Sequence, residues 1–208
     1  MAKKVGIFGG TFDPIHNAHL ILAEHAWEQF QLDTVLLMPC AVPPHKENRE
    51  IASALHRSRM VQLAIEDNNH LKFSNFELER TGITHTADTV RLLSEEHPEC
   101  EYFFILGADS LFYIEKWYHP EEILQQIPII AAVRGEMDRN DLQKQIAYLQ
   151  ERYPASQIAL LDTPHIEISS TMIRENIRQG KTIKYYVPKD VEKYIYQQKL
   201  YQKSETGR

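Results

Sequence analysis

Short apolar runs alternate with amphipathic stretches along nearly the whole chain. The apolar runs predict strands at Lys4–Phe8, Val35–Met38, Lys72–Leu78, Tyr102–Leu106, Ile129–Val133 and Ile158–Leu161. The amphipathic stretches predict helices at Asn17–Phe30, after a Ser53 cap, and at Thr86–Glu96, Pro120–Gln126, Asp138–Arg152, Ser170–Gln179 and Lys189–Lys199. This order is typical of an α/β fold, and we expect a Rossmann-like open, mostly parallel sheet with helices on both faces.

The chain shows no repeat, low-complexity tract or linker that would divide it. We therefore expect a single domain over residues 1–208, with a C-terminal helical part from about residue 169 and a frayed tail at 204–208.

The balance of charge narrows the possible partners. The chain has 23 Lys and Arg against 29 Asp and Glu, a formal net charge of −6. A protein that binds a nucleic-acid polymer needs a cationic surface, so we expect none as a partner. The apolar run before Gly9 is too short for a signal-peptide core or a membrane span, so we expect a cytoplasmic protein with no membrane partner. Cys40 and Cys100 have neither the number of a disulfide framework nor the spacing of a zinc cluster.

The densest chemical signal is the run Gly9–His19 (GGTFDPIHNAH), which lies between a predicted strand and a predicted helix. Glycines there let the backbone approach a ligand closely, and a helix that starts after an Asn17 cap directs free N–H groups toward an anion. His16 and His19 lie on one side of the first helical turn, where both rings can reach a phosphate. The alternatives are a capping turn with surface histidines, or a metal pair, although His-x-x-His without a third ligand is weak evidence for zinc.

The second signal is Ser169–Arg174 (SSTMIR), a run of hydroxyls that opens a helix with an arginine one turn later. Taken alone, it is equally explained by a serine cap followed by an exposed Arg174. Hydroxyls, helix N–H groups and a guanidinium all donate to phosphate oxygens, so the run also fits a second phosphate clamp. Together the two motifs predict a polyphosphate held from two sides.

These two motifs resemble those of the nucleotidyltransferase superfamily. Further matches narrow the resemblance to the bacterial nicotinate-nucleotide adenylyltransferase family, and they cover nearly the whole chain in order: Pro43–Lys46, Thr84–Thr89, Ile105–Ser110, Lys116–Tyr118, Val187-Pro188, Tyr194-Ile195 and Leu200-Tyr201. Three positions depart from the family pattern: Ala18 in place of glycine, Ala87 in place of an aromatic residue, and Arg134-Gly135 without an intervening proline.

The resemblance implies that ATP and nicotinate mononucleotide give nicotinate adenine dinucleotide and pyrophosphate, a step of NAD biosynthesis. It implies catalytic roles for His16, His19 and Arg174, with no protein metal site and with Mg²⁺ carried on the ATP phosphates. ATP would be bound by Gly9, Gly10, Thr11, Phe12, His16, His19, Gly107, Asp109, Ser170, Thr171 and Arg174. Nicotinate mononucleotide would be bound by Lys46, Thr86, Asp109, Trp117 and Arg134.

Two other functions fit the same motifs. One is a related transferase with another acceptor, such as a phosphopantetheine adenylyltransferase or a cytidylyltransferase. The other is a non-catalytic nucleotide sensor. The sequence leaves a homo-oligomer possible, because the C-terminal tyrosines suit either a subunit interface or a cover for the sheet.

Overall fold

The strands form a single six-stranded parallel sheet. The computed structural model describes residues 2–41, 51–80, 84–133 and 139–202, and the strand order is β3-β2-β1-β4-β5-β6. The strands are β1 (Lys3–Gly10), β2 (Thr34–Pro39), β3 (Leu71–Phe73), β4 (Cys100–Gly107), β5 (Ile129–Ala132) and β6 (Ile158–Leu161). The predicted α/β fold with its parallel sheet is confirmed.

One strand prediction is wrong in its second half. The chain leaves β3 after Phe73 and forms turns, in which the N–H groups of Leu78 and Glu79 both donate to the carbonyl of Asn75. Phe76 packs against the core from this turn. Phe76 is thus an apolar residue that reaches the core from a turn. Its position extended the alternation of apolar and polar residues, and this alternation predicted a longer strand.

The predicted helices are present in the described parts of the chain. They are α1 (Asn17–Gln29), α2 (Ala54–Ala64), α3 (Thr86–Glu96), α5 (Pro120–Gln126), α6 (Arg139–Arg152), α7 (Ser170–Arg178) and α8 (Lys189–Gln197). Two short elements were not predicted, α4 (Ala108–Leu111) and the 3₁₀ turn η1 (Ile114–Lys116). Each is too short for a helical period to show in the sequence. No helix within the described ranges is long and apolar enough to cross a membrane.

Helices cover both faces of the sheet, and each face has its own core. Along β1, Phe8 packs into the cluster that contains α1, α2, α7 and α8, whereas Ile7 packs into the cluster of α3, α5 and α6. β4 alternates in the same way, with Ile105 on the first side and Phe104 on the second. Side chains of a strand point to opposite faces in turn, so strands buried on both faces read as continuous apolar runs.

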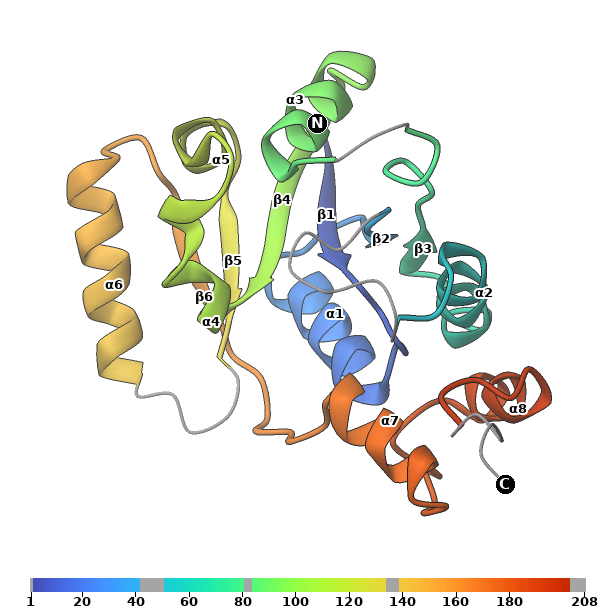
Figure 1. Ribbon diagram of the computed structural model, residues 1–208. Helices are drawn as coiled ribbons and strands as arrows, with labels where there is room; N and C mark the ends of the chain where they lie inside the picture. The colour runs from blue at the N-terminus through green and yellow to red at the C-terminus, as the bar shows by residue number, and fades with distance from the viewer. Residues whose placement is uncertain (1, 42–50, 81–83, 134–138, 203–208) are drawn as a thin grey trace.

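The site is positioned by the order of the strands. β1 pairs with β2 on one edge and with β4 on the other, and the chain crosses from one side to the other between β3 and β4. In such a sheet, ligands bind beyond the carboxyl ends of the strands, where the order reverses. β1 ends at Gly10 and β4 ends at Gly107, and Figure 1 shows α7 near the end of the sheet toward which these two strands run.

Candidate active site

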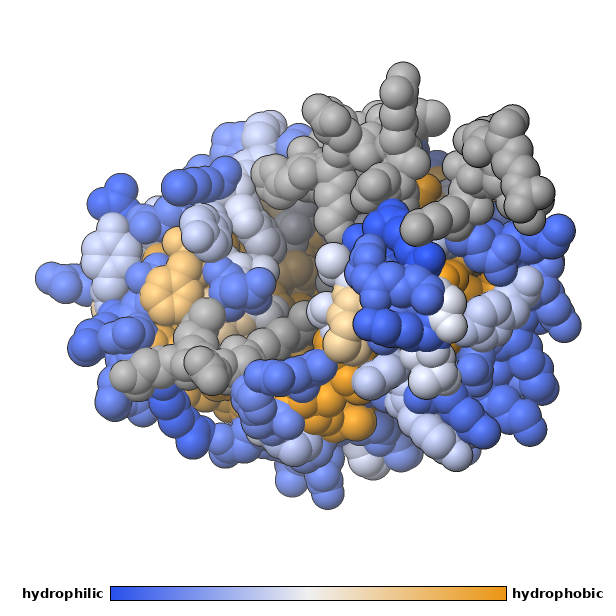
Figure 2. All heavy atoms as spheres, turned by 60° about the horizontal axis from the view of Figure 1, so that its bottom comes forward, coloured by the Kyte–Doolittle hydropathy of each residue, from blue (hydrophilic) through white to orange (hydrophobic). Residues whose placement is uncertain are grey.

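A cavity of about 260 Å³ opens at this switch point between β1 and β4. Figure 2 brings this end of the molecule forward and shows a hollow near the middle of the face, with apolar atoms inside it. The structure brings together nine of the residues expected at the site as part of the lining: Gly9, Gly10, Thr11, Phe12, His19, Gly107, Asp109, Trp117 and Ser170. Residues distant from one another in the sequence therefore meet in one place, and Ser170 is the member of the second motif among them.

The Gly9–Phe12 wall contains a close approach between Gly10 and the ring of Phe12. The Phe12 backbone is in the left-handed region, with φ at 48°, and its ring folds back over Gly10. A Cβ atom at Gly10 would lie 3.0 Å from Cζ of that ring, closer than side-chain atoms normally pack. The glycine therefore lets Phe12 close against the strand end, and the Phe12 ring meets His19 edge-on at a centroid distance of 5.2 Å.

His16 and His19 lie together at the start of α1, as the spacing predicted. Their rings stack with centroids 3.6 Å apart and planes inclined by 21°. His16 is buried, with 2% of its surface exposed, and its backbone N–H donates to Nδ1 of His19 at 3.3 Å. When Nδ1 of a neutral imidazole accepts, the proton is on Nε2. His19 is thus arranged as a hydrogen-bond donor on the wall of the cavity, with His16 supporting its ring.

The predicted Asn17 cap is wrong. His16 is the N-cap of α1, with extended backbone angles, and Asn17 is the first helical residue. The Asn17 backbone N–H donates to the carbonyl of Tyr186 at 2.9 Å, and its side-chain amide donates to the carbonyl of Tyr185 at 2.7 Å. This N–H is therefore not open to an anion. Asn17 instead attaches the segment after α7 to the start of α1.

The Ser169–Arg174 motif contains both a cap and a contact with the site. Ser169 is the N-cap of α7 and accepts from the N–H of Met172. Ser170 lines the cavity, and its hydroxyl donates to the carbonyl of Pro14 at 2.9 Å. Thr171 is exposed and accepts from Arg174, but neither residue is among those that line the cavity.

Arg174 is buried rather than exposed, with 8% of its surface accessible. Its guanidinium donates to the carbonyl of Asp13 at 2.7 Å and lies 3.7 Å from that residue's carboxylate. The alternative of a simple surface arginine is therefore wrong. In this conformation, Arg174 supports the loop between β1 and α1, which we call the motif loop.

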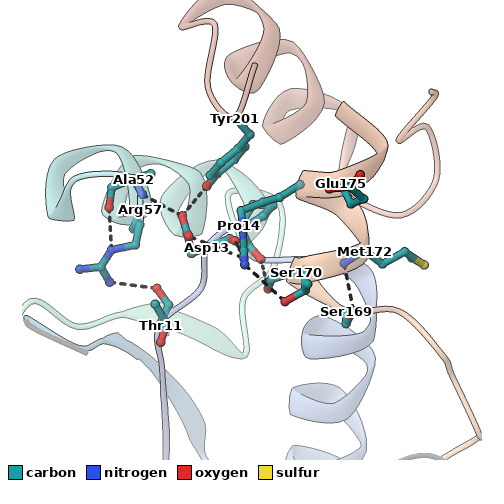
Figure 3. A network of polar contacts seen from close by, with 12 residues as sticks. Thr11, Asp13, Pro14, Ala52, Arg57, Ser169, Ser170, Met172, Glu175 and Tyr201 are labelled. Atoms are coloured by element: carbon teal, nitrogen blue, oxygen red, sulfur yellow. Dashed lines mark hydrogen bonds and ion pairs between the residues drawn. The ribbon is translucent and has the colours of Figure 1, made fainter. Parts of the chain in front are cut away.

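A second buried arginine supports the same loop, and no motif in the sequence predicts this role. Arg57 of α2 is 1% exposed and donates to the carbonyl oxygens of Thr11, Ala52, Cys40 and Ala41. Figure 3 shows Arg57 and Thr11 joined in this way, with Asp13 nearby. In a trans peptide the carbonyl and the next N–H point in opposite directions. Arg57 therefore turns the N–H of Phe12 away from itself.

A second cavity, of about 390 Å³, lies beside the first. It shares Asp109, Ser110 and Trp117 with the first cavity, and it adds Tyr113 and Lys116. The two hollows are thus contiguous, with Trp117 between them. The ring of Trp117 is fixed edge-on against Phe104 at a centroid distance of 6.2 Å.

The remaining expected residues are less central. Thr86 begins α3 and is half-buried, but it does not line either cavity. Lys46 and Arg134, like the 204–208 tail, lie outside the described residues.

Three residues of this region were missed as site residues: Asp13, Arg57 and Tyr201. Asp13 stands within the Gly9–His19 motif, so its position offered a signal. Arg57 and Tyr201 offered none, because a lone arginine on a helix and a lone tyrosine near a chain end resemble ordinary surface residues.

No cluster of three or more His, Cys, Asp or Glu side chains suited to a metal ion is found in the part of the chain that the structure describes. Within the cavity lining, the carboxylate is that of Asp109.

Comparison with known proteins identifies the family. The cytidylyltransferase-like family model matches residues 7–176. The chain is 40% identical to the nicotinate-nucleotide adenylyltransferase of Bacillus subtilis (strain 168) over 200 residues, which is 96% of this chain and 99% of that protein. A relative from Lachnoclostridium phytofermentans that bears the same enzyme name is 43% identical over 199 residues, with the same coverage of both chains.

A solved structure shares the fold at lower identity. The Plasmodium falciparum nicotinic acid mononucleotide adenylyltransferase complexed with NaAD superposes with a TM-score of 0.80 at 23% identity, and the match covers 96% of this chain and 97% of that one. At this identity the likeness concerns the fold. On the sequence matches, the chain belongs to the nicotinate-nucleotide adenylyltransferase family of cytidylyltransferase-like proteins.

Proposed function

We propose that this enzyme transfers the adenylyl group of ATP to nicotinate mononucleotide, which gives nicotinate adenine dinucleotide and pyrophosphate in NAD biosynthesis. The observation that carries the proposal is the pair of contiguous cavities at the switch point, one under the histidine motif and one beside Trp117. A reaction between two nucleotides needs two adjoining sites. We expect the reaction to take place in the cytoplasm.

In the proposed reaction, the phosphate oxygen of the acceptor attacks the α-phosphorus of ATP, the new P–O bond forms, and pyrophosphate leaves. The attacking oxygen is already ionised near neutral pH, so the protein needs no general base. Its contribution is to position the reactants and to neutralise charge, which are the main effects in phosphoryl transfer. The Nε2–H of His19 is the donor we assign to the α-phosphate, and Ser170 lines the same cavity with its hydroxyl donating to the carbonyl of Pro14.

Two sources of positive charge oppose the negative charge of the triphosphate. Mg²⁺ arrives with ATP as part of the substrate and neutralises the phosphate oxygens. Behind the Gly9–Phe12 wall, Arg57 and Arg174 place two guanidinium groups against backbone carbonyls. A buried cation acts over a distance in a medium of low dielectric. Its field therefore favours an anion in the cavity even without contact.

The acceptor is placed by shape and stacking. Trp117 presents an aromatic ring held by Phe104, and such a face suits a pyridine ring. Asp109, at the end of β4, is placed to accept from ribose hydroxyls on either side, because it lines both cavities. Lys46, Thr86 and Arg134 remain candidates for the acceptor's carboxylate and phosphate.

The test is a pyrophosphate-release assay with Mg·ATP and a panel of acceptors. We expect turnover with nicotinate mononucleotide, and much weaker turnover with nicotinamide mononucleotide and with phosphopantetheine. Turnover with another acceptor alone would make the enzyme a transferase of different specificity. Tight ATP binding without turnover on any acceptor would make it a nucleotide sensor. Either result overturns the proposal.

A further inference from the structure

A tyrosine that follows the last helix contacts the loop between β1 and α1. The hydroxyl of Tyr201, which follows α8, donates to Oδ1 of Asp13 at 2.6 Å. The two residues are 188 positions apart in the sequence. The same oxygen accepts from the backbone N–H of Ala52 at 3.1 Å, and Asp13 is 1% exposed. Figure 3 shows Tyr201 and Ala52 converging on this carboxylate.

Asp13 also contacts α7, the helix that carries the Ser169–Arg174 motif. Its backbone carbonyl accepts from Arg174, whose guanidinium lies 3.7 Å from Oδ2. Oδ2 has no hydrogen bond among the described residues, so the ion pair with Arg174 is its main partner. One residue therefore joins α7, the segment before α2 and the end of the chain to the loop that lines the cavity.

We propose that Tyr201 is a positioning residue for adenylyl transfer, whose hydroxyl holds the Asp13 carboxylate and, through it, both Arg174 and the Gly9–Phe12 wall. This inference rests on the proposed function and adds a residue that touches neither cavity.

The chemistry of the contact favours this role over simple packing. An uncompensated charge in the interior is costly, so the two hydrogen bonds that Oδ1 accepts and the ion pair of Oδ2 with Arg174 stabilise this buried carboxylate. Burial and the neighbouring Asp13 charge both raise the pKa of the Tyr201 hydroxyl, so it remains a donor throughout the working pH range. Without that donor, the carboxylate keeps the hydrogen bond from the Ala52 N–H and the ion pair with Arg174. It then shifts toward Arg174 or toward water, where it can regain a partner. The loop backbone on both sides of Asp13 then moves with it.

Tyr201→Phe tests the hydroxyl while it keeps the ring. The matched control is Tyr196→Phe, which removes a hydroxyl from an exposed tyrosine of the neighbouring helix α8. A hydrogen bond to a charged group corresponds to roughly a tenfold effect or more when it is lost. We expect Tyr201→Phe to lower kcat by about tenfold and to raise the KM for ATP several-fold. The KM for nicotinate mononucleotide, whose site lies beside Trp117, is expected to stay within twofold, as is every parameter of Tyr196→Phe.

A purely structural role would give a different pattern. In that case Tyr201→Phe lowers the thermal unfolding midpoint but leaves kcat and the KM for ATP within twofold of the wild type, and this result overturns the proposal. A rise in the two KM values by the same factor with kcat unchanged also overturns it, because the effect would not be confined to the ATP side.

A second variant tests whether the effect passes through Asp13. Asp13→Asn keeps an oxygen that accepts from Tyr201 but removes the charge, and a hydrogen bond between neutral groups is weaker than one to a carboxylate. We therefore expect Tyr201→Phe to reduce kcat by a smaller factor in the Asp13→Asn background than in the wild type. Equal factors in the two backgrounds would show that Tyr201 acts independently of Asp13 and would overturn the proposal.

Calorimetric titration with Mg·ATP alone separates this inference from the proposed function. It needs no acceptor, so it remains informative if the wild type uses another acceptor or none. We expect Tyr201→Phe to bind Mg·ATP several-fold more weakly than the wild type, and Tyr196→Phe to bind it equally well. Equal affinity of all three proteins overturns the positioning role, whatever the acceptor panel shows.

Discussion

The two nitrogens of the His19 ring have different tasks, and substitutions can separate them. Nδ1 accepts from the backbone N–H of His16 at 3.3 Å, and Nε2 carries the proton that we assign to the α-phosphate. His19→Gln extends an amide to about the position of Nε2. His19→Asn places its amide at about the position of Nδ1 and cannot reach as far. His19→Ala removes both groups.

The expected magnitudes follow from what each group contacts. Loss of a positioned donor to a transition-state oxyanion typically lowers turnover by about 10²–10³, which is roughly 2.7–4 kcal/mol on the barrier. The bond to His16 is a long one at a helix terminus, and caps of this kind contribute about 1 kcal/mol to stability. For a chain of this size, that loss lowers the unfolding midpoint by about 2–4 °C, so the protein remains folded at ordinary assay temperatures.

The assay is steady-state pyrophosphate release from Mg·ATP and nicotinate mononucleotide, with thermal unfolding recorded for each variant. We expect His19→Ala and His19→Asn to lose about 10²–10³ in kcat, and His19→Gln to retain several-fold more activity than either. His97→Gln, at an exposed histidine of another element, serves as the control and should match the wild type. Equal activity of the Asn and Gln variants would refute the assignment of Nε2. An Ala variant within threefold of the wild type would refute any direct role for His19.

Three further changes test other parts of the molecule. Trp117→Ala should raise the KM for nicotinate mononucleotide by about 5- to 160-fold, because stacking on an aromatic ring contributes about 1–3 kcal/mol per base. Trp117→Phe should recover most of this, and an unchanged KM in the alanine variant would exclude stacking. Gly6→Ala would place a Cβ 2.8 Å from Cδ1 of Leu32 in the core, and we expect denaturant titration to show a loss of about 1–3 kcal/mol. Gly9→Ala is the control, since its Cβ finds its nearest neighbour at 4.0 Å, and equal stabilities of the two variants would contradict the packing. Burial raises the pKa of the Cys40 thiol, so less thiolate is present at any given pH. In a variant whose other cysteine is serine, Ellman's reagent should react more slowly with the folded protein than with the unfolded protein at pH 8. The rate for the folded protein should still rise with pH above pH 9.

The sheet could be predicted because parallel strands are buried on both faces. β1 and β4 read as continuous apolar runs that end in glycine, and helices with one apolar side separate the strands. The short α4 and η1 could not be predicted, since a single turn carries no period. The cap of α1 was misplaced by one residue, because an asparagine is a better cap by composition than a histidine, and the contact of Asn17 with Tyr185 joins parts of the chain that only folding brings together.

The sequence predicted the residues of the two motifs that line the cavity. It did not predict the residues from other parts of the chain that support those motifs. Gly10 and His19 carry a local signal, since a strand end followed by a helix start is readable from the sequence. Arg57 carries none, because its role depends on carbonyl oxygens of three separate segments. Hydrogen bonds to backbone carbonyls are not visible in the identity of the residues that provide them. The supporting shell of such a site therefore has to be taken from the structure.

The chain has a net charge of −6, and its proposed substrates are anions. The buried residues that support the cavity wall explain how such a chain can bind them. The hydrogen bonds that Arg57 makes to the described residues all end on backbone carbonyls, which are dipoles and carry no full negative charge. Arg174 is paired with the Asp13 carboxylate at 3.7 Å, so these two buried charges largely offset each other outside the pair. Acidic groups such as Asp88, Glu95, Asp141 and Asp190 lie in exposed surface pairs, where water and salt screen them within about 10 Å. Arg57 therefore adds positive charge behind the cavity wall, and an excess of acidic residues elsewhere in the chain does not by itself prevent the site from binding two nucleotides.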